Sequence, residues 1–167
     1  MVEESGCYRF CELSLQLRGA GVLYAGRESV GRKAGDVLLM GAPVPHWYEI
    51  RSHPVEYVTL YFFPTALVNW VSPDVSILLL QRFTALPPLA PRNVRLPTPL
   101  LREFTQAFRS AAAEFESQRF GWELHLQASL VQVLVTLTRW ERGLGRIPKS
   151  AARTVDWEWL DRALHHP

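Results

Sequence analysis

Apolar and polar residues alternate strictly near the start of the chain. From Cys11 to Arg18, apolar side chains occupy the odd positions and polar side chains occupy the even positions. A period of two is typical of a β-strand whose two faces meet different surroundings. Turn signals at 19–21 and 34–36 separate this run from further apolar stretches at 22–24, 37–40, 47–50 and 55–63. Short strands divided by glycine and proline turns favour a sandwich or a barrel.

Helical periodicity replaces this alternation after a proline-rich stretch. Residues 86–99 contain too many prolines for regular structure, so we expect an irregular connection out of the barrel there. Apolar residues then recur at helical spacing over 101–115, with Thr98 as the candidate N-cap and Pro99 at the first helical position. A second helix is predicted from about Phe120 to Arg142. The sequence thus predicts a mainly β region followed by two antiparallel helices.

The second predicted helix carries two apolar stripes. One stripe consists of Leu126, Leu130, Val133, Leu134, Leu137 and Trp140, and the other of Phe120, Leu124, Ala128, Val131 and Val135. A surface helix needs only one apolar stripe. The second stripe therefore indicates either a partner subunit or a helix that is central in a monomer. We expect a homodimer, with either stripe facing the partner and with these candidate interface residues: Leu126, Leu130, Val131, Leu134 and Leu137.

Composition places the chain among ordinary soluble domains. It has 167 residues, of which 48% are hydrophobic and 20% are charged, and its net charge is +2. A domain that binds DNA by itself normally carries a basic face, which this charge balance does not favour. We find no apolar run of membrane-spanning length and no signal-peptide pattern, and therefore expect a cytoplasmic protein without a membrane partner.

Two stretches match the spacing of the cupin motifs. Glu12 and Gly19 have the spacing of the Glu and Gly that end the first motif. Gly35 and His46 have the spacing of the first Gly and the His of the second motif. The resemblance implies a cupin-like double-stranded β-helix, or jelly-roll, barrel. Metal-binding cupins place two histidines before the Glu, where this chain has Gly6 and Tyr8. We therefore expect no bound metal, no cofactor and no catalytic residues.

The wider chain resembles the sensor domain of AraC-type bacterial transcription regulators. The resemblance rests on the segments 17–21, 34–39, 45–48 and 60–64, followed by the helical pair. It implies a ligand-sensing and dimerisation domain that binds a small effector inside the barrel. Residues 160–166 resemble the start of that family's DNA-binding domain, whose remainder is absent, so DNA is expected to be contacted only through that missing domain. The expected division is 1–97 for the barrel, 98–143 for the dimerisation helices, and 144–167 for a linker and the truncated DNA-binding domain.

The same resemblance suggests which side chains face the effector. Matched by position to the arabinose-type regulators, the sugar contacts fall on Arg18, Tyr48, Tyr57 and Thr59. Alternation independently places Tyr57, Thr59 and Tyr61 on one strand face. The predicted ligand-binding set is completed by Tyr8, Glu12, Tyr61 and His46. His46 has a structural role as its alternative. An arginine with several tyrosines suits a sugar-like, carboxylated or aromatic effector.

Two other functions compete with the sensor. One is a metal-independent cupin enzyme acting on a sugar or small acid, and the other is a truncated product that acts only as an oligomerisation module. The residues at the histidine positions, Gly6 and Tyr8, and the helical tail both favour the sensor, so we do not expect an enzyme.

Overall fold

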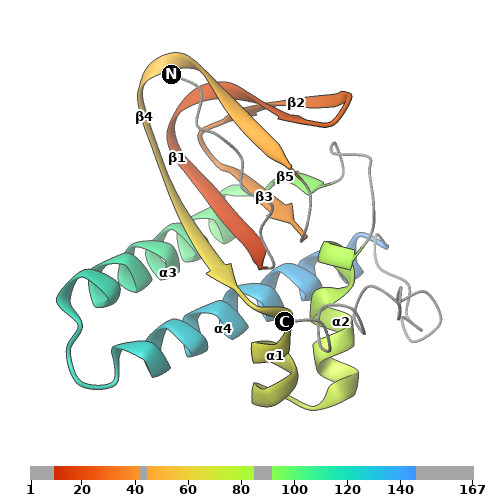
Figure 1. The fold of residues 1–167 in the computed structure, drawn as a ribbon, viewed down its shortest axis with the longest axis vertical. Coiled ribbons are helices and arrows are strands. Elements are labelled where there is room, and N and C mark those ends of the chain that lie inside the picture. Colours follow the sequence, from red (N-terminus) through yellow and green to blue (C-terminus); the bar gives the residue numbers. More distant parts are fainter. Residues whose placement is uncertain (1–9, 42–44, 85–91, 146–167) are drawn as a thin grey trace.

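Two long strands, β1 (Cys11–Ala25) and β4 (His46–Phe62), pair antiparallel along most of their lengths and are the longest strands of the sheet (Figure 1). The computed structural model describes residues 10–41, 45–84 and 92–145. Because β1 runs without interruption, the glycines at 19–21 are not the turn that the sequence predicts. The runs at 47–50 and 55–63 likewise belong to one strand rather than two.

Three shorter strands pair with the long ones. β2 (Glu28–Lys33) pairs with the second half of β1, and β3 (Asp36–Met40) pairs with its first half. β5 (Asn93–Arg95) pairs with β3 and lies within the proline-rich stretch that was expected to be irregular. That expectation was wrong for these three residues because they sit between the prolines and complete the sheet next to β3.

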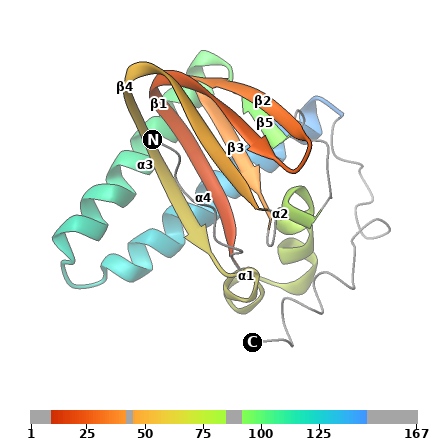
Figure 2. The ribbon, with the colours of Figure 1, turned by 45° about the horizontal axis from the view of Figure 1, so that its top comes forward.

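The sheet curls into a half-barrel (Figure 2), which confirms the predicted cupin-like class. Tyr48 pairs with Leu23, yet its hydroxyl lies 3.4 Å from the Gln16 side chain, seven positions back along β1. A straight strand would put those positions roughly 23 Å apart. The bend falls where the register with β4 shifts, around Gly19, whose φ is +76°. A Cβ there would lie 2.7 Å from the Pro54 carbonyl oxygen, so this bend requires glycine.

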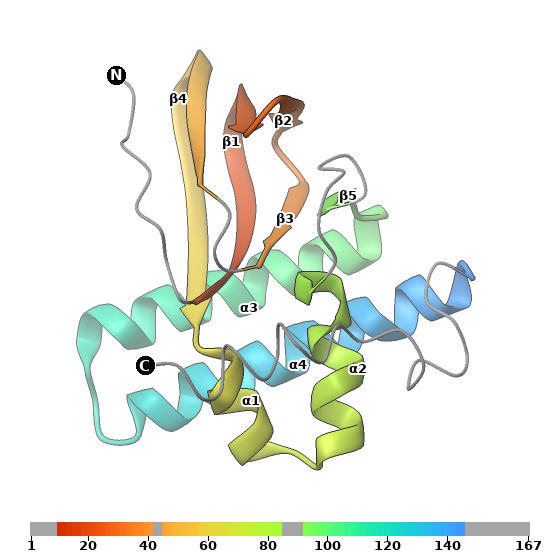
Figure 3. The same cartoon turned by 45° about the vertical axis from the view of Figure 1, so that its right-hand side comes forward.

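Two long helices, α3 (Thr98–Ser117) and α4 (Trp122–Gly143), form an antiparallel pair against the sheet (Figures 1 and 3). Both were predicted to within two residues at each end, although Pro97 rather than Thr98 occupies the N-cap position of α3. Two further helices, α1 (Pro64–Trp70) and α2 (Pro73–Thr84), were not predicted and lie between β4 and β5.

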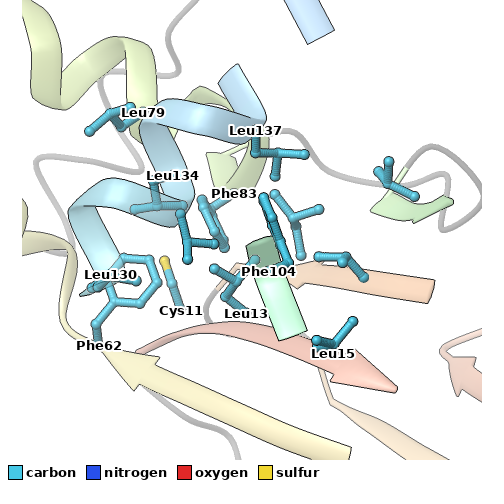
Figure 4. Packing of buried hydrophobic residues seen from close by; sticks show 14 of the residues in the cluster. Cys11, Leu13, Leu15, Phe62, Leu79, Phe83, Phe104, Leu130, Leu134 and Leu137 are labelled. Atoms are coloured by element: carbon cyan, nitrogen blue, oxygen red, sulfur yellow. The ribbon is translucent and has the colours of Figure 1, made fainter. Parts of the chain in front are cut away.

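The main core lies between the sheet and the helices (Figure 4). The odd-numbered residues from Cys11 to Leu17 point into it, and Leu13 shares one buried cluster with Phe104 of α3 and Leu134 of α4. Phe62 of β4 packs edge-to-face on Phe83 of α2 with ring centroids 5.3 Å apart. All four helices therefore contribute residues to the core on the apolar face of the sheet.

Several predictions fall outside the described residues. Tyr8 lies outside the described residues, as does the segment 85–91. The segment 146–167 also lies outside them, and it includes almost all of the predicted linker and start of the DNA-binding domain. Among the helices of the described part, none combines the length and the apolar character needed to cross a membrane.

Candidate functional site

The face of the sheet opposite the helices is polar along β1 and β4. In the β1–β4 register, Glu12 pairs with Tyr61, Ser14 with Thr59, and Gln16 with Tyr57. Paired residues share a face, so alternation on two strands brings these six side chains together. We call this surface, on the inside of the curl, the concave face. It comprises Glu12, Ser14, Gln16, Arg32, Leu38, Met40, His46, Tyr48, Tyr57, Thr59 and Tyr61.

Glu12 and His46 meet at one end of the concave face. Glu12 Oε2 lies 3.0 Å from His46 Nε2, and the two side chains are 11% and 20% exposed. These are the residues at the conserved spacing of the two cupin motifs, and the fold brings them together. Among the described residues no cluster of three or more His, Cys, Asp or Glu side chains is placed to hold a metal ion. A metal-free protein remains a prediction.

Further hydrogen bonds satisfy the buried polar groups of β1. The Thr59 hydroxyl lies 3.0 Å from that of Ser14, and the Tyr48 hydroxyl donates to Gln16 Oε1. Burial raises the pKa of the Tyr48 phenol, while the Gln16 hydrogen bond and the nearby Arg32 charge act in the opposite direction. Tyr48 fits here because Gly21 leaves room for it: a Cβ on Gly21 would lie 2.4 Å from the tyrosine ring.

Arg32 of β2 is a buried cation on the concave face. It is 5% exposed, its Nη2 donates to the Ser14 carbonyl at 3.2 Å, and its guanidinium carbon lies 6.0 Å from the centre of the Tyr48 ring. Burial lowers the pKa of Arg32, an effect opposed by the charges of Glu12, Tyr48, Asp36 and Tyr57. Sequence reasoning missed this residue because it did not recognise β2. The alternation of Val30 and Arg32 with Gly31 and Lys33 indicates a strand, but it does not indicate that Arg32 is buried.

The other predicted ligand residues are more accessible. Tyr57 is 41% exposed, Tyr61 is 57% exposed and Thr59 is half-buried. Arg18 is exposed and lies between two shifts in the β1–β4 register, where strict alternation of side chains no longer holds. Among the described residues of the concave face, the buried arginine is therefore Arg32 rather than Arg18.

A groove of about 690 Å³ adjoins the concave face along β4. It lies between β4 and the helices. Residues 57–62 of β4 line one side, with Val58, Leu60 and Phe62 from the core face as well as Tyr57, Thr59 and Tyr61. Residues of α3 and α4, including Phe115, Trp122 and Leu126, line the opposite wall. The volume is typical of a small-molecule site.

The two stripes of α4 have different surroundings. Leu130, Leu134 and Leu137 are buried in the core of the chain itself, so they are not available as interface residues on its surface. Leu126 is half-buried and lines the groove, and Val131 is half-buried at the edge of the core. The stripe that faces the chain's own core is therefore the first one.

A curled antiparallel sheet with a hydrogen-bonded polar concave face, backed by helices, defines a cupin-like ligand-binding domain. The family described as the AraC-like ligand binding domain matches residues 4–134. The chain therefore belongs to this family and is a ligand-sensing regulatory domain. Comparison with curated proteins found no match.

Proposed function

We propose that this domain senses a small effector on its concave face and acts in transcription regulation as a cytoplasmic homodimer. The observation that carries the proposal is the set of buried, hydrogen-bonded polar side chains on the inside of the curl. Ser14, Gln16 and Arg32 are all nearly inaccessible there. Burying polar groups is costly unless they are hydrogen-bonded, and these three make hydrogen bonds to neighbours on the same face. A few placed polar groups among apolar walls suit a small ligand.

The proposed ligand contacts come from both long strands. Tyr48, Tyr57 and Thr59 offer hydroxyls and aromatic faces, and Tyr61 lies at the open side beside the groove. Glu12 and His46 lie at one end of the concave face. Arg18 remains in the proposed set as an exposed residue near the bend.

The proposed dimer forms through the second stripe of α4. Leu124 is 69% exposed, Ala128 is exposed, and Val131 and Val135 are half-buried. Pairing two copies would remove this apolar surface from water, and two-fold dimers are the commonest closed assembly. DNA contact is assigned to a separate C-terminal domain, because the net charge of +2 gives this chain no pronounced basic character.

The proposal is tested by a thermal-shift screen of sugars, aliphatic acids and aromatic acids on the full chain. A compound that binds only the folded state raises its melting temperature in a concentration-dependent way. We expect at least one class to do so and expect the compound to be recovered unchanged. If no class raised the melting temperature at millimolar concentration, the sensor function would be wrong.

A metal-independent enzyme is the alternative, because a carboxylate 3.0 Å from an imidazole can act as a general acid–base pair. Conversion of the bound compound, abolished by His46→Ala, would favour that alternative.

A further inference from the structure

We infer that the effector is an organic anion whose carboxylate binds Arg32, with an apolar or aromatic body held against Tyr48 and Tyr57. This inference rests on the proposed sensor function and narrows its ligand class.

Arg32 uses few of its hydrogen-bond donors within the described part of the chain. A guanidinium has five N–H donors. Its interactions in the described part of the chain are one hydrogen bond to the Ser14 carbonyl and a distant contact with the Tyr48 ring. Its Nε is fully buried and has no hydrogen-bond acceptor there. Neutral groups thus satisfy a small share of the donors.

The charge of Arg32 has no contacting counter-charge among the described residues. The described residues place no carboxylate within ion-pair distance of Arg32, although other buried charges have close partners. Glu12 is hydrogen-bonded to His46, and Asp36 is paired with Arg95 at 2.6 Å. Their fields reach Arg32 and oppose the effect of burial on its pKa, but neither carboxylate contacts it. A buried cation without a contacting anion is unfavourable for the free protein.

Aromatic and apolar side chains surround Arg32. The Tyr48 ring lies beside the guanidinium, and the Tyr57 ring stands edge-on to Tyr48 with centroids 6.4 Å apart. Leu38 and Met40 form an apolar cluster behind Tyr48. Tyr57 is 41% exposed, so an aromatic surface next to Tyr48 is accessible from solvent. A carboxylate can accept two parallel hydrogen bonds from a guanidinium, which a sugar hydroxyl cannot do.

The test compares acids with their neutral amides on the full chain: benzoate with benzamide, 4-hydroxybenzoate with 4-hydroxybenzamide, and phenylacetate with phenylacetamide. We expect at least one acid to bind about tenfold or more tightly than its amide by calorimetry. Arg32→Met should remove this preference and leave the melting temperature of the free protein unchanged or raised, since it removes an uncompensated buried charge. The matched control is Lys33→Met, which changes an exposed cation at the next position of β2 and should keep the preference.

Each contrary result overturns the inference. One is an acid that retains its advantage in Arg32→Met, and another is a large fall in the melting temperature of that variant, which would assign Arg32 to the fold. If amides or sugars bind wild type and Arg32→Met equally while no acid is preferred, the inference is wrong and the sensor function stands. If neither acids, amides nor sugars bind, both are wrong.

Discussion

The two faces of β1 are almost equally shielded from water but differ in chemistry. Leu13 and Leu15 are 0% exposed on the face toward the helices, and Ser14 and Gln16 are 1% exposed on the concave face. Burial of the leucines stabilises the fold by roughly 1.5–3 kcal/mol for each side chain. Burial of the polar residues is close to neutral, because their hydrogen bonds mainly offset desolvation. Burial alone therefore does not distinguish a packing surface from a recognition surface.

Helix α4 shows the same contrast between its two stripes. Leu134 is buried among the helices and the sheet, whereas Leu124, in the second stripe, is mostly exposed. Substitutions on the core-facing side of β1 or α4 should therefore change the stability of the fold. Substitutions on the concave face or on the second stripe should instead change ligand binding or assembly.

The largest expected effect is on α4. Leu134→Glu should unfold the domain, because it places an unpaired carboxylate in the core. Val131→Glu should instead give a folded monomer, since its charge can reach water once the partner is lost. Circular dichroism and light scattering measure the two outcomes. A wild-type chain that is monomeric at tens of micromolar, or a dimeric Val131→Glu variant, would contradict the proposed interface.

A smaller effect is expected within β1. Leu13→Ala should lower the free energy of unfolding by about 2–5 kcal/mol, because it leaves a cavity between sheet and helices. Ser14→Ala, one position away, should lower it by about 1 kcal/mol through its lost hydrogen bond with Thr59. Urea denaturation measures both, and equal losses would show that the two faces do not differ as described.

Ligand affinity should respond to the concave face with little change in stability. Tyr57→Ala and Arg18→Ala should each weaken binding of the compound found in the thermal-shift screen by roughly tenfold to a hundredfold, about 1.5–3 kcal/mol. Their melting temperatures without ligand should stay near that of wild type, because both side chains are exposed. Calorimetry on the two variants provides the measurement, and unchanged affinity in both would remove them from the site.

The smallest effect is expected for Glu12→Gln. The amide keeps the shape and one hydrogen bond to His46, so the free energy of unfolding should fall by roughly 0.5–1 kcal/mol. Urea denaturation at neutral pH is again the measurement. A loss of several kcal/mol would mean that this pair belongs to the core and not to a tolerant recognition surface.

Periodicity predicted the parts of the fold in which one face is uniformly apolar. The alternation from Cys11 to Arg18 and the helical spacing after Leu101 both correspond to elements that bury one face against the main core. The glycines at 19–21 were misleading because a glycine permits either a turn or a bend within a strand. Glycine is required at Gly19 because the backbone carbonyl of Pro54, far along the chain, lies close to it, and no local pattern includes that contact.

The candidate site was less predictable than the fold. Glu12 and His46 followed from motif spacing, and their contact agrees with it. Arg32 did not, because an arginine next to Lys33 in a short polar segment has the local pattern of a solvent-exposed strand. Its burial results from the curl of the sheet, which carries Arg32 over Ser14. Likewise, the two stripes of α4 were visible in the sequence, but only packing against the sheet distinguishes the stripe in the core.

The pairing of β1 with β4 has a consequence for the order of folding. Ala25 pairs with nearby Glu28 in the β1–β2 hairpin, whereas Cys11 pairs with distant Phe62 in β4. Closing a short loop costs less entropy than closing a long one, and non-local strand pairs form slowly. We therefore expect the hairpin to form early and β4 to dock late. Tyr48, Tyr57 and Thr59 all lie on β4, so the binding surface should form only in the final step of folding. A ligand should therefore not accelerate the earlier steps.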